Sequence, residues 1–295
     1  MPAPFVSVVI PAYQYPAGLR RCLAALGRQS LPHGAFEVLV VDDGSPEPLE
    51  PALAPGMGRE SGAFSVRFLR VPNGGPARAR NLGVQAARGE WIAFTDHDCE
   101  PDAGWLHHLA ASAREHGDVL LGGPKRNGLP ENPYSAAHES LSDFVVRWFA
   151  RPGHPVPFFT TNNLAMRRES FLSLGGFDGR FPFAHEDRDF AFRWKATGRG
   201  MHFVSKAVVT HYHDYTLASF CRQHFRYGQG AADFHRARCK SKEPRPRFEG
   251  LRFYSAMLRE PWREANGWRA ARSSALIALS QALYALGYYS HRRAS

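Results

Sequence analysis

Four short apolar runs constrain the fold of this chain more than any other feature. Each is long enough for a strand, and they lie at Val6–Ile10, Glu37–Val41, Val66–Val71 and Trp91–Phe94. Segments with a helical spacing of apolar residues separate them, at Ala17–Gln29 and Ala77–Ala87. Strands that are nearly continuous apolar runs are typical of a mainly parallel sheet covered by helices on both faces. The pattern therefore predicts an α/β fold with a Rossmann-like sheet.

The second half of the chain continues this alternation less regularly. Further strands are expected at Val119–Gly123, Thr161–Met166 and Met201–Thr210. Further helices are expected at Trp105–His116, Ser140–Phe149, Arg168–Leu174 and Arg188–Thr197. Pro, Asn and Gly loosen the pattern in 125–157, and the chain becomes helical and basic after Thr216.

Charge is distributed unevenly along the chain. Residues 222–295 hold 15 Lys and Arg against 5 Asp and Glu, and the basic residues are densest in Lys240–Arg247. The two signs balance over the rest of the chain, so the whole net charge of +10 comes from this last quarter. A basic tail suits an anionic membrane surface or a nucleic acid, and charge alone does not decide between them.

Cysteine usage and the amino terminus indicate the compartment. Cys22, Cys99, Cys221 and Cys239 lie far apart, without the spacing of a zinc site, and are expected to be reduced thiols. The apolar run near Met1 lacks a charged leader and is too short for a signal peptide or a membrane span. We therefore expect a cytoplasmic protein.

Acidic residues follow two of the predicted strands. Asp42 and Asp43 end the second strand, and Asp96 and Asp98 follow the fourth. Because parallel strands end at one edge of the sheet, these carboxylates are expected to line one crevice, where a divalent cation with a nucleoside diphosphate could bind. The alternative is a pair of acidic turns, since Asp is a common turn residue.

Three further clusters have both a chemical and a structural interpretation. Gly74–Asn81 opens a helix with arginines and could bind an anion, or could be a solvated helix start. Glu186 and Asp187 could include a general base, or could simply favour the first turn of a helix. His211 and His213 follow a strand, and His211, the first after the apolar run, is the preferred third metal ligand.

These motifs together resemble those of the family 2 glycosyltransferases over roughly residues 5–230. The matching motifs are Val8 to Tyr13, Val-Asp-Asp-Gly-Ser at 41–45, Asn-x-Gly to Ala-Arg-Asn-x-Gly at 73–83, Asp-x-Asp at 96–98, Gly-Gly-Phe-Asp at 175–178 and Glu-Asp at 186–187. The resemblance implies a GT-A fold in 1–220, with a nucleotide-sugar half at about 1–100 and an acceptor half at about 101–220. A basic, helical extension would follow at 221–295.

The resemblance also implies a role for each motif residue. Asp96 would flank the ribose and, with Asp98 and His211, hold Mn²⁺ or Mg²⁺ on the diphosphate. Asp187 would deprotonate the acceptor hydroxyl, with Glu186 beside it. The ring of Tyr13 would lie against the base, and the carboxylate of Asp42 or Asp43 would accept a hydrogen bond from it. The full set of residues expected to contact the nucleotide is Pro11, Ala12, Tyr13, Asp42, Asp43, Arg80 and Asn81.

The implied reaction is the inverting transfer of a sugar from a nucleoside diphosphate sugar, and a UDP-sugar is the expected donor. The implied acceptor is a glycan or a lipid-linked molecule, in the assembly of a cell-surface glycan, polysaccharide or glycolipid. His97 stands where the family often has a small residue, and the segment Arg222–Gly228 lacks the Gln-x-x-Arg-Trp motif of the processive synthases. The alternatives are a sugar-phosphate nucleotidyltransferase and a basic nucleic-acid-binding module. The first normally has a Gly-rich loop after its first strand, where this chain has Pro11 to Gln14, and the second would not gather carboxylates in its cleft.

Ser274–Tyr289 is apolar, and Arg269, Arg272, Arg292 and Arg293 flank it. It is shorter than the ~20 residues that span a bilayer, so we expect a helix that lies at the cytoplasmic membrane face. A terminal helix packed on its own domain, or a dimer contact, is the alternative.

Overall fold

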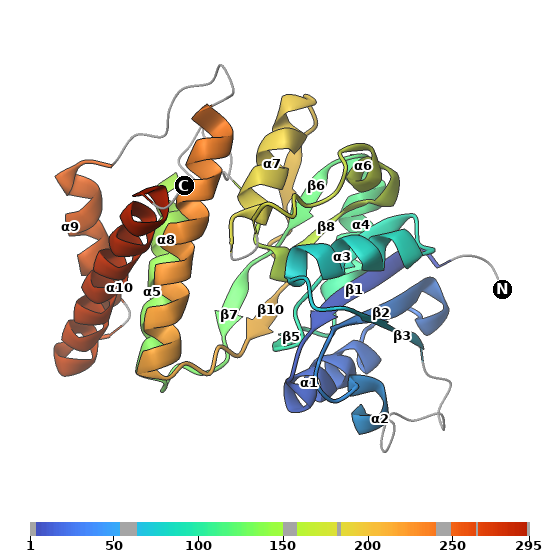
Figure 1. Cartoon of the computed structure of the whole chain (residues 1–295). Coiled ribbons are helices and arrows are strands. Elements are labelled where there is room, and N and C mark those ends of the chain that lie inside the picture. Colours follow the sequence, from blue (N-terminus) through green and yellow to red (C-terminus); the bar gives the residue numbers. More distant parts are fainter. Residues whose placement is uncertain are drawn as a thin grey trace. The chain divides into compact units, whose positions relative to one another are not determined.

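The computed structural model describes residues 4–53, 64–149, 158–181, 184–239, 249–263 and 265–293. The basic stretch Lys240–Arg247 lies outside the described residues. The chain forms two compact units (Figure 1). The first comprises Met1–Arg126, Phe158–Pro182 and Glu186–His211, and the second comprises Asn127–Pro157, Phe183–His185 and Tyr212–Ser295.

A seven-stranded sheet with the order β3-β2-β1-β4-β8-β6-β9 forms the first unit. Its strands are β1 (Val6–Ala12), β2 (Phe36–Asp43), β3 (Ser65–Val71), β4 (Trp91–Phe94), β6 (Leu120–Gly122), β8 (Leu164–Arg167) and β9 (Met201–Phe203). The pairs β1–β2, β1–β4, β2–β3 and β6–β9 are parallel, whereas β8 runs antiparallel to β4 and β6. The predicted mainly parallel sheet is confirmed.

Helices cover both faces of this sheet. They are α1 (Pro16–Gly27), α2 (Leu49–Leu53), α3 (Pro76–Ala86), α4 (Trp105–His116), α6 (Arg168–Ser173) and α7 (Glu186–Ala196). Leu19 and Leu26 of α1 share one core with Val8 and Val38, while α3 lies against the other face. A Cβ atom on Gly83 of α3 would lie only 2.4 Å from Val9 Cγ1, so the glycine lets α3 approach the sheet.

Two of the predicted strands differ from the observed ones. Met201–Thr210 was expected to be one strand but is two, because a turn closed by Ala207 N–H to Val204 O intervenes. β9 joins the large sheet, and β10 (Val209–His211) joins a three-stranded sheet with β5 (Cys99–Pro101) and β7 (Lys125–Asn127). Thr161–Met166 begins with a 3₁₀ turn, η2 (Thr161–Asn163), before β8 starts.

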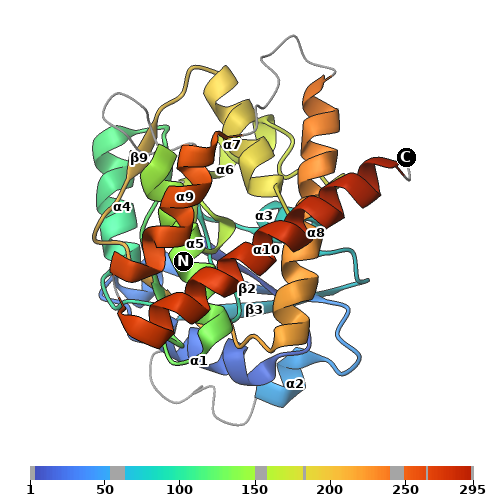
Figure 2. The same ribbon diagram turned by 90° about the vertical axis from the view of Figure 1, so that its left-hand side faces the viewer.

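The second unit is helical. It contains α5 (Pro133–Phe149), α8 (Leu217–Cys239), α9 (Leu251–Arg259), η3 (Glu260–Arg263) and α10 (Gly267–Arg293). Figure 2 shows α10 crossing α8, and the helices meet at glycines. A Cβ atom on Gly228 would lie 2.0 Å from Tyr284 O, and one on Gly287 would lie 2.1 Å from Phe225 O. The helical character predicted for the end of the chain is confirmed.

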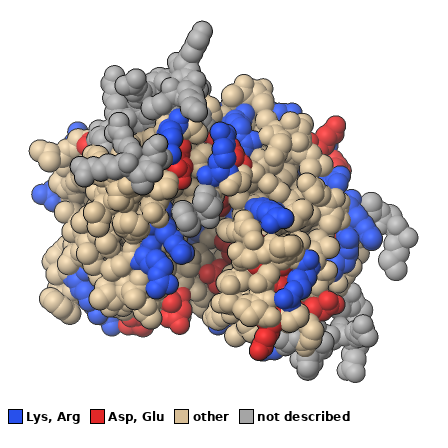
Figure 3. All heavy atoms as spheres, viewed as in Figure 1, with Lys and Arg blue, Asp and Glu red and all other residues tan. Residues whose placement is uncertain are grey.

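Surface charge and helix composition both bear on the predicted membrane helix. Lys and Arg side chains are interspersed with Asp and Glu side chains on the face drawn in Figure 3. Within the described part of the chain, none of the helices combines the length and the apolar character that crossing a bilayer requires. In α10, Ile277 and Tyr288 are buried in contact with neighbouring helices, so only part of Ser274–Tyr289 faces outward.

Candidate active site

Three parallel strands bring the predicted donor residues to one edge of the sheet. Ala12 at the end of β1 pairs with Asp42 in β2, and Val9 pairs with Phe94 at the end of β4. The residues after β1, the end of β2 and the loop after β4 therefore leave the sheet close together. The sequence predicts this placement, because polar residues directly follow each apolar run and so lie at the carboxyl end of its strand.

Asp42 and Asp43 shape the loops at this edge. Asp42 accepts hydrogen bonds from Ser45 N–H at 2.9 Å and Leu49 N–H at 3.3 Å. Asp43 accepts them from Gly74 N–H at 2.9 Å and Gly75 N–H at 2.8 Å. Arg70 also lies 3.6 Å from Asp42 Oδ2, and Asn73 Nδ2 donates to Asp43 Oδ2 at 3.4 Å, so all four carboxylate oxygens have partners in the neighbouring loops. Their predicted contact with a nucleobase stays a prediction.

The first strand ends in a loop with an unusual backbone. Pro11 and Ala12 are buried, whereas Tyr13 is 41% exposed and leaves part of its ring accessible. Gln14 has a φ of 53° and donates its N–H to Ser45 Oγ at 3.1 Å. The Nδ1 atom of His97 lies 3.1 Å from Pro11 O, so the loop after β4 is tied to the end of β1.

Arg80 joins two acidic motifs from the interior. It is only 3% exposed, and its guanidinium contacts Asp96 Oδ1 at 2.6 Å and Glu186 Oε1 at 3.1 Å. Burial opposes the charge, but the two carboxylates raise the pKa of Arg80 above its ordinary value. The structure thus brings together three residues that lie up to 106 positions apart in the sequence.

Asn81 lies next to Arg80 and has a different environment. Its Nδ2 atom donates to Phe177 O at 2.8 Å, and its Oδ1 atom accepts from Phe177 N–H at 2.9 Å. Both polar atoms of the amide are therefore bound to the Gly-Gly-Phe-Asp turn. Its predicted contact with the nucleotide stays a prediction.

Glu186 and Asp187 begin helix α7, two residues before the predicted start. Burial and the neighbouring Asp187 raise the pKa of Glu186 to about 7, although Arg80 opposes the shift. Burial also raises the pKa of Asp187, against the effect of Arg188. One oxygen of Asp187 accepts the Arg188 N–H at 2.7 Å. A carboxylate with a raised pKa is a stronger base, which suits proton abstraction near neutral pH.

Asp98 and His211 form the candidate metal site of the first unit. β10 pairs with β5 so that His211 lies opposite Cys99, and its Nε2 atom is 3.3 Å from Asp98 Oδ2. Burial disfavours protonation of the imidazole, but the Asp98 carboxylate raises the pKa of His211. A carboxylate and an imidazole suit Mn²⁺, so these residues fit the implied ion. His213 belongs to the second unit.

One residue beside this pair was not predicted. Asn162 is buried, and its Nδ2 atom lies 3.3 Å from His211 Nδ1. The sequence signal was weak, because Asn162 and Asn163 fall in a segment that the apolar pattern assigns to a strand.

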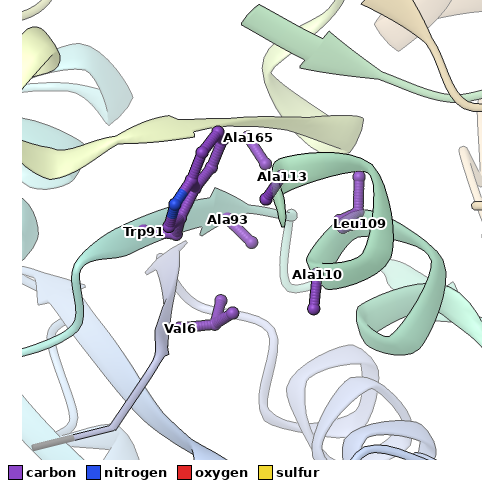
Figure 4. A pocket seen from close by; sticks show the side chains of 7 residues that line it. All are labelled: Val6, Trp91, Ala93, Leu109, Ala110, Ala113 and Ala165. Atoms are coloured by element: carbon purple, nitrogen blue, oxygen red, sulfur yellow. The ribbon is translucent and has the colours of Figure 1, made fainter. Parts of the chain in front are cut away.

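An apolar cavity in the first unit is not a candidate for the donor site. Figure 4 shows its seven lining residues, Val6, Trp91, Ala93, Leu109, Ala110, Ala113 and Ala165. Its volume of about 10 Å³ is no larger than a single water needs. It is a packing gap between α4 and the sheet.

Comparison with known proteins identifies the class and the family. The structure of a mannosyltransferase from Pyrobaculum calidifontis, PcManGT in complex with GDP-Man and Mn²⁺, aligns with 96% of this chain and 76% of its own at a TM-score of 0.60 and 21% identity. S. aureus TarS residues 1–349 with UDP-GlcNAc aligns with 98% of this chain and 90% of its own at a TM-score of 0.53 and 17% identity. The fold is that of the GT-A glycosyltransferases.

Sequence comparison is more specific. The family model described as "Glycosyl transferase family 2" matches residues 7–175, and that of "Glycosyl transferase family group 2" matches 96–290. The chain therefore belongs to glycosyl transferase family 2. The glycosyltransferase AglE of Haloferax volcanii is 33% identical over 233 residues, which cover 77% of this chain and 73% of AglE.

A second relative is longer. The pre-mycofactocin glycosyltransferase of Mycobacterium tuberculosis is 31% identical over 233 residues, which are 77% of this chain and 47% of that protein. The present chain thus spans about half the length of that relative.

Proposed function

We propose that this protein is a metal-dependent, inverting glycosyltransferase that moves a sugar from a nucleoside diphosphate sugar to an acceptor hydroxyl. The observation that carries the proposal is the buried Arg80, which contacts Asp96 at 2.6 Å and Glu186 at 3.1 Å. This contact supports a single site in which the donor motif and the carboxylate pair act together.

Asp98 and His211 would hold the cation, and Asp96 would flank the ribose. A bound Mn²⁺ or Mg²⁺ would supply positive charge to the diphosphate leaving group. The strong pairing of Asp96 with Arg80 supports Asp98 as the more direct metal ligand.

Asp187 would accept the proton of the attacking hydroxyl, and Glu186 would position it. Direct attack by the acceptor on the face opposite the leaving group inverts the anomeric centre, so no enzyme nucleophile is needed. The raised pKa of Asp187 supports this role.

The donor would bind over the end of β1. Tyr13 would lie against the base, Asp42 or Asp43 would accept its imide N–H, and Pro11 and Ala12 would line the pocket. Arg80 and Asn81 would lie near the nucleotide. A UDP-sugar is the proposed donor, although the structural neighbours include complexes with both UDP-GlcNAc and GDP-Man.

The acceptor is proposed to be a glycan or lipid-linked saccharide in cell-surface glycan assembly. Residues 1–220 would form the catalytic domain, and 221–295 would bring it to the cytoplasmic membrane face. The exposed side chains of Trp262 and Trp268 support such a contact, since tryptophan favours the membrane interface.

A nucleotide-sugar panel tests the proposal. Purified protein is assayed for Mn²⁺-dependent binding and transfer, with Asp98→Ala and Asp187→Asn as test variants. Asp118→Asn is the matched control, because Asp118 pairs with Arg199 at 2.7 Å outside the proposed site. We expect Asp98→Ala to lose the Mn²⁺ response and Asp187→Asn to bind the donor but not transfer. Transfer that survives both changes contradicts the mechanism.

A further inference from the structure

The residue behind His211 connects the candidate metal site to a fixed turn. Asn162 lies in η2 and is 5% exposed. Its Nδ2 atom is 3.3 Å from His211 Nδ1, and its Oδ1 atom accepts a hydrogen bond from Thr160 Oγ1 at 2.7 Å. His211 Nε2, on the other side of the ring, is 3.3 Å from Asp98. The Nε2 atom of the imidazole thus faces Asp98, and the Nδ1 atom faces Asn162.

The turn that carries Asn162 has little freedom. Its neighbour Asn163 accepts a hydrogen bond from Trp105 Nε1 at 2.9 Å. The Asn163 amide nitrogen donates to Pro124 O at 3.0 Å and to Ala207 O at 2.8 Å. Ala207 lies in the segment that leads into β10, so the same turn holds Asn162 and the approach to His211. The hydrogen bonds of Asn163 therefore hold Asn162 in place beside the imidazole.

The chemistry of imidazole decides what the Asn162 side chain must do. A ring nitrogen that binds a cation cannot carry a proton, so a neutral His211 that binds through Nε2 carries its proton on Nδ1. That proton needs an acceptor in a buried site. In the structure the NH₂ group of Asn162 faces His211 Nδ1. A half-turn of the amide about Cβ–Cγ brings its oxygen there instead, where it can accept the proton. The Thr160 hydroxyl can donate to the oxygen or accept from the NH₂ group, so it remains bonded in both orientations.

We propose that Asn162 is a positioning residue for the metal site: it fixes the His211 ring and accepts the Nδ1 proton when Nε2 binds a divalent cation. The inference rests on the metal role of His211 in the proposed function. It adds that Asn162, with Thr160 behind it, selects the nitrogen that His211 offers. The cation is not touched by Asn162, which acts through His211.

Binding of Mn²⁺ alone, measured by electron paramagnetic resonance, tests this role without reference to activity. Asn162→Ala removes the acceptor, and we expect it to weaken Mn²⁺ binding by about 10- to 100-fold, the usual effect of losing such a partner. Asn162→Asp restores an acceptor of similar shape, and we expect Mn²⁺ binding at least as tight as in the unchanged protein. A purely structural role would not be rescued in this way, because aspartate adds a buried charge.

Nitrogen NMR of the labelled, Mg²⁺-loaded protein provides a measurement that needs no variant. We expect the proton of His211 on Nδ1 and the pyridine-like signal on Nε2. The reverse assignment overturns the proposal, as does an Asn162→Ala protein that folds and binds Mn²⁺ within twofold of the unchanged protein. If Asp98→Ala also leaves Mn²⁺ binding intact, the metal site of the proposed function fails. If Asp98→Ala abolishes binding and Asn162→Ala does not, only the role of Asn162 fails.

Discussion

Glu186 makes the stability of the first unit depend on pH in a predictable direction. Its pKa is raised from 4.5 to about 7 by burial and by Asp187. A carboxyl group whose pKa is higher in the folded than in the unfolded protein stabilises the folded state. The contribution is complete below the pKa of the unfolded state and is lost as the pH rises to the pKa of the folded state. Two to three pH units at about 1.4 kcal/mol each give a loss on the order of 3 kcal/mol between pH 4.5 and 7. Glu186→Gln cannot lose a proton and should escape this loss.

The measurement is the free energy of unfolding in urea at several pH values from 4.5 to 8. The free energy of Glu186→Gln minus that of the unchanged protein should rise by about 3 kcal/mol up to pH 7 and then stay level. Taking the difference cancels titrating groups that do not interact with Glu186, including His211, whose raised pKa acts in the same direction. The neighbouring Asp187 contributes to the difference together with Glu186. Glu169→Gln, at an exposed carboxyl in the first turn of α6, is the control and should give a flat difference. A flat difference for Glu186→Gln as well refutes the reasoning.

Three other changes have clear outcomes. Arg80→Met leaves two carboxylates beside an uncharged chain and should cost about 3–5 kcal/mol in urea unfolding, whereas Arg80→Lys should recover part of the loss. Burial lowers the pKa of His224 to about 4, so its contribution to stability should vanish as pH falls from 6.5 to 4. His224→Phe should remove that slope, and an unchanged slope contradicts this. Gly44→Ala should lower the melting temperature, because Gly44 has a φ of 70° and a Cβ atom there would lie 2.6 Å from Asn73 N.

The sequence predicted the elements whose signal is local. Trp91–Phe94 and Trp105–His116 match β4 and α4 at both ends, because a continuous apolar run and a clear helical period leave no alternative. The division of 201–210 was not predicted, since the turn at Ala207 depends on a backbone hydrogen bond rather than on a Gly or Pro. The early start of α5 at Pro133 was also missed. There Asn132 Oδ1 accepts the N–H groups of Tyr134 and Ser135, a cap that apolar periodicity does not reveal.

The candidate site divides in the same way. The aspartates at the end of β2 and in the loop after β4 were predictable, because parallel strands bring their ends together. Asn162 was not, because it touches His211 across 49 residues and its role depends on one nitrogen of a ring. Contacts of this kind depend on the tertiary structure, and no spacing in the sequence encodes them.

Arg80 explains why an Asp-x-Asp pair can have two different tasks. The first aspartate is neutralised by a buried guanidinium at 2.6 Å, which also contacts Glu186. The second lies beside the imidazole of His211, whose Nε2 atom is 3.3 Å from Asp98 Oδ2. Because Arg80 already engages Asp96, we propose Asp98 as the more direct ligand of a divalent ion. In the proposed function, the spacing of one residue would let one loop hold one carboxylate for the buried arginine and another for a cation.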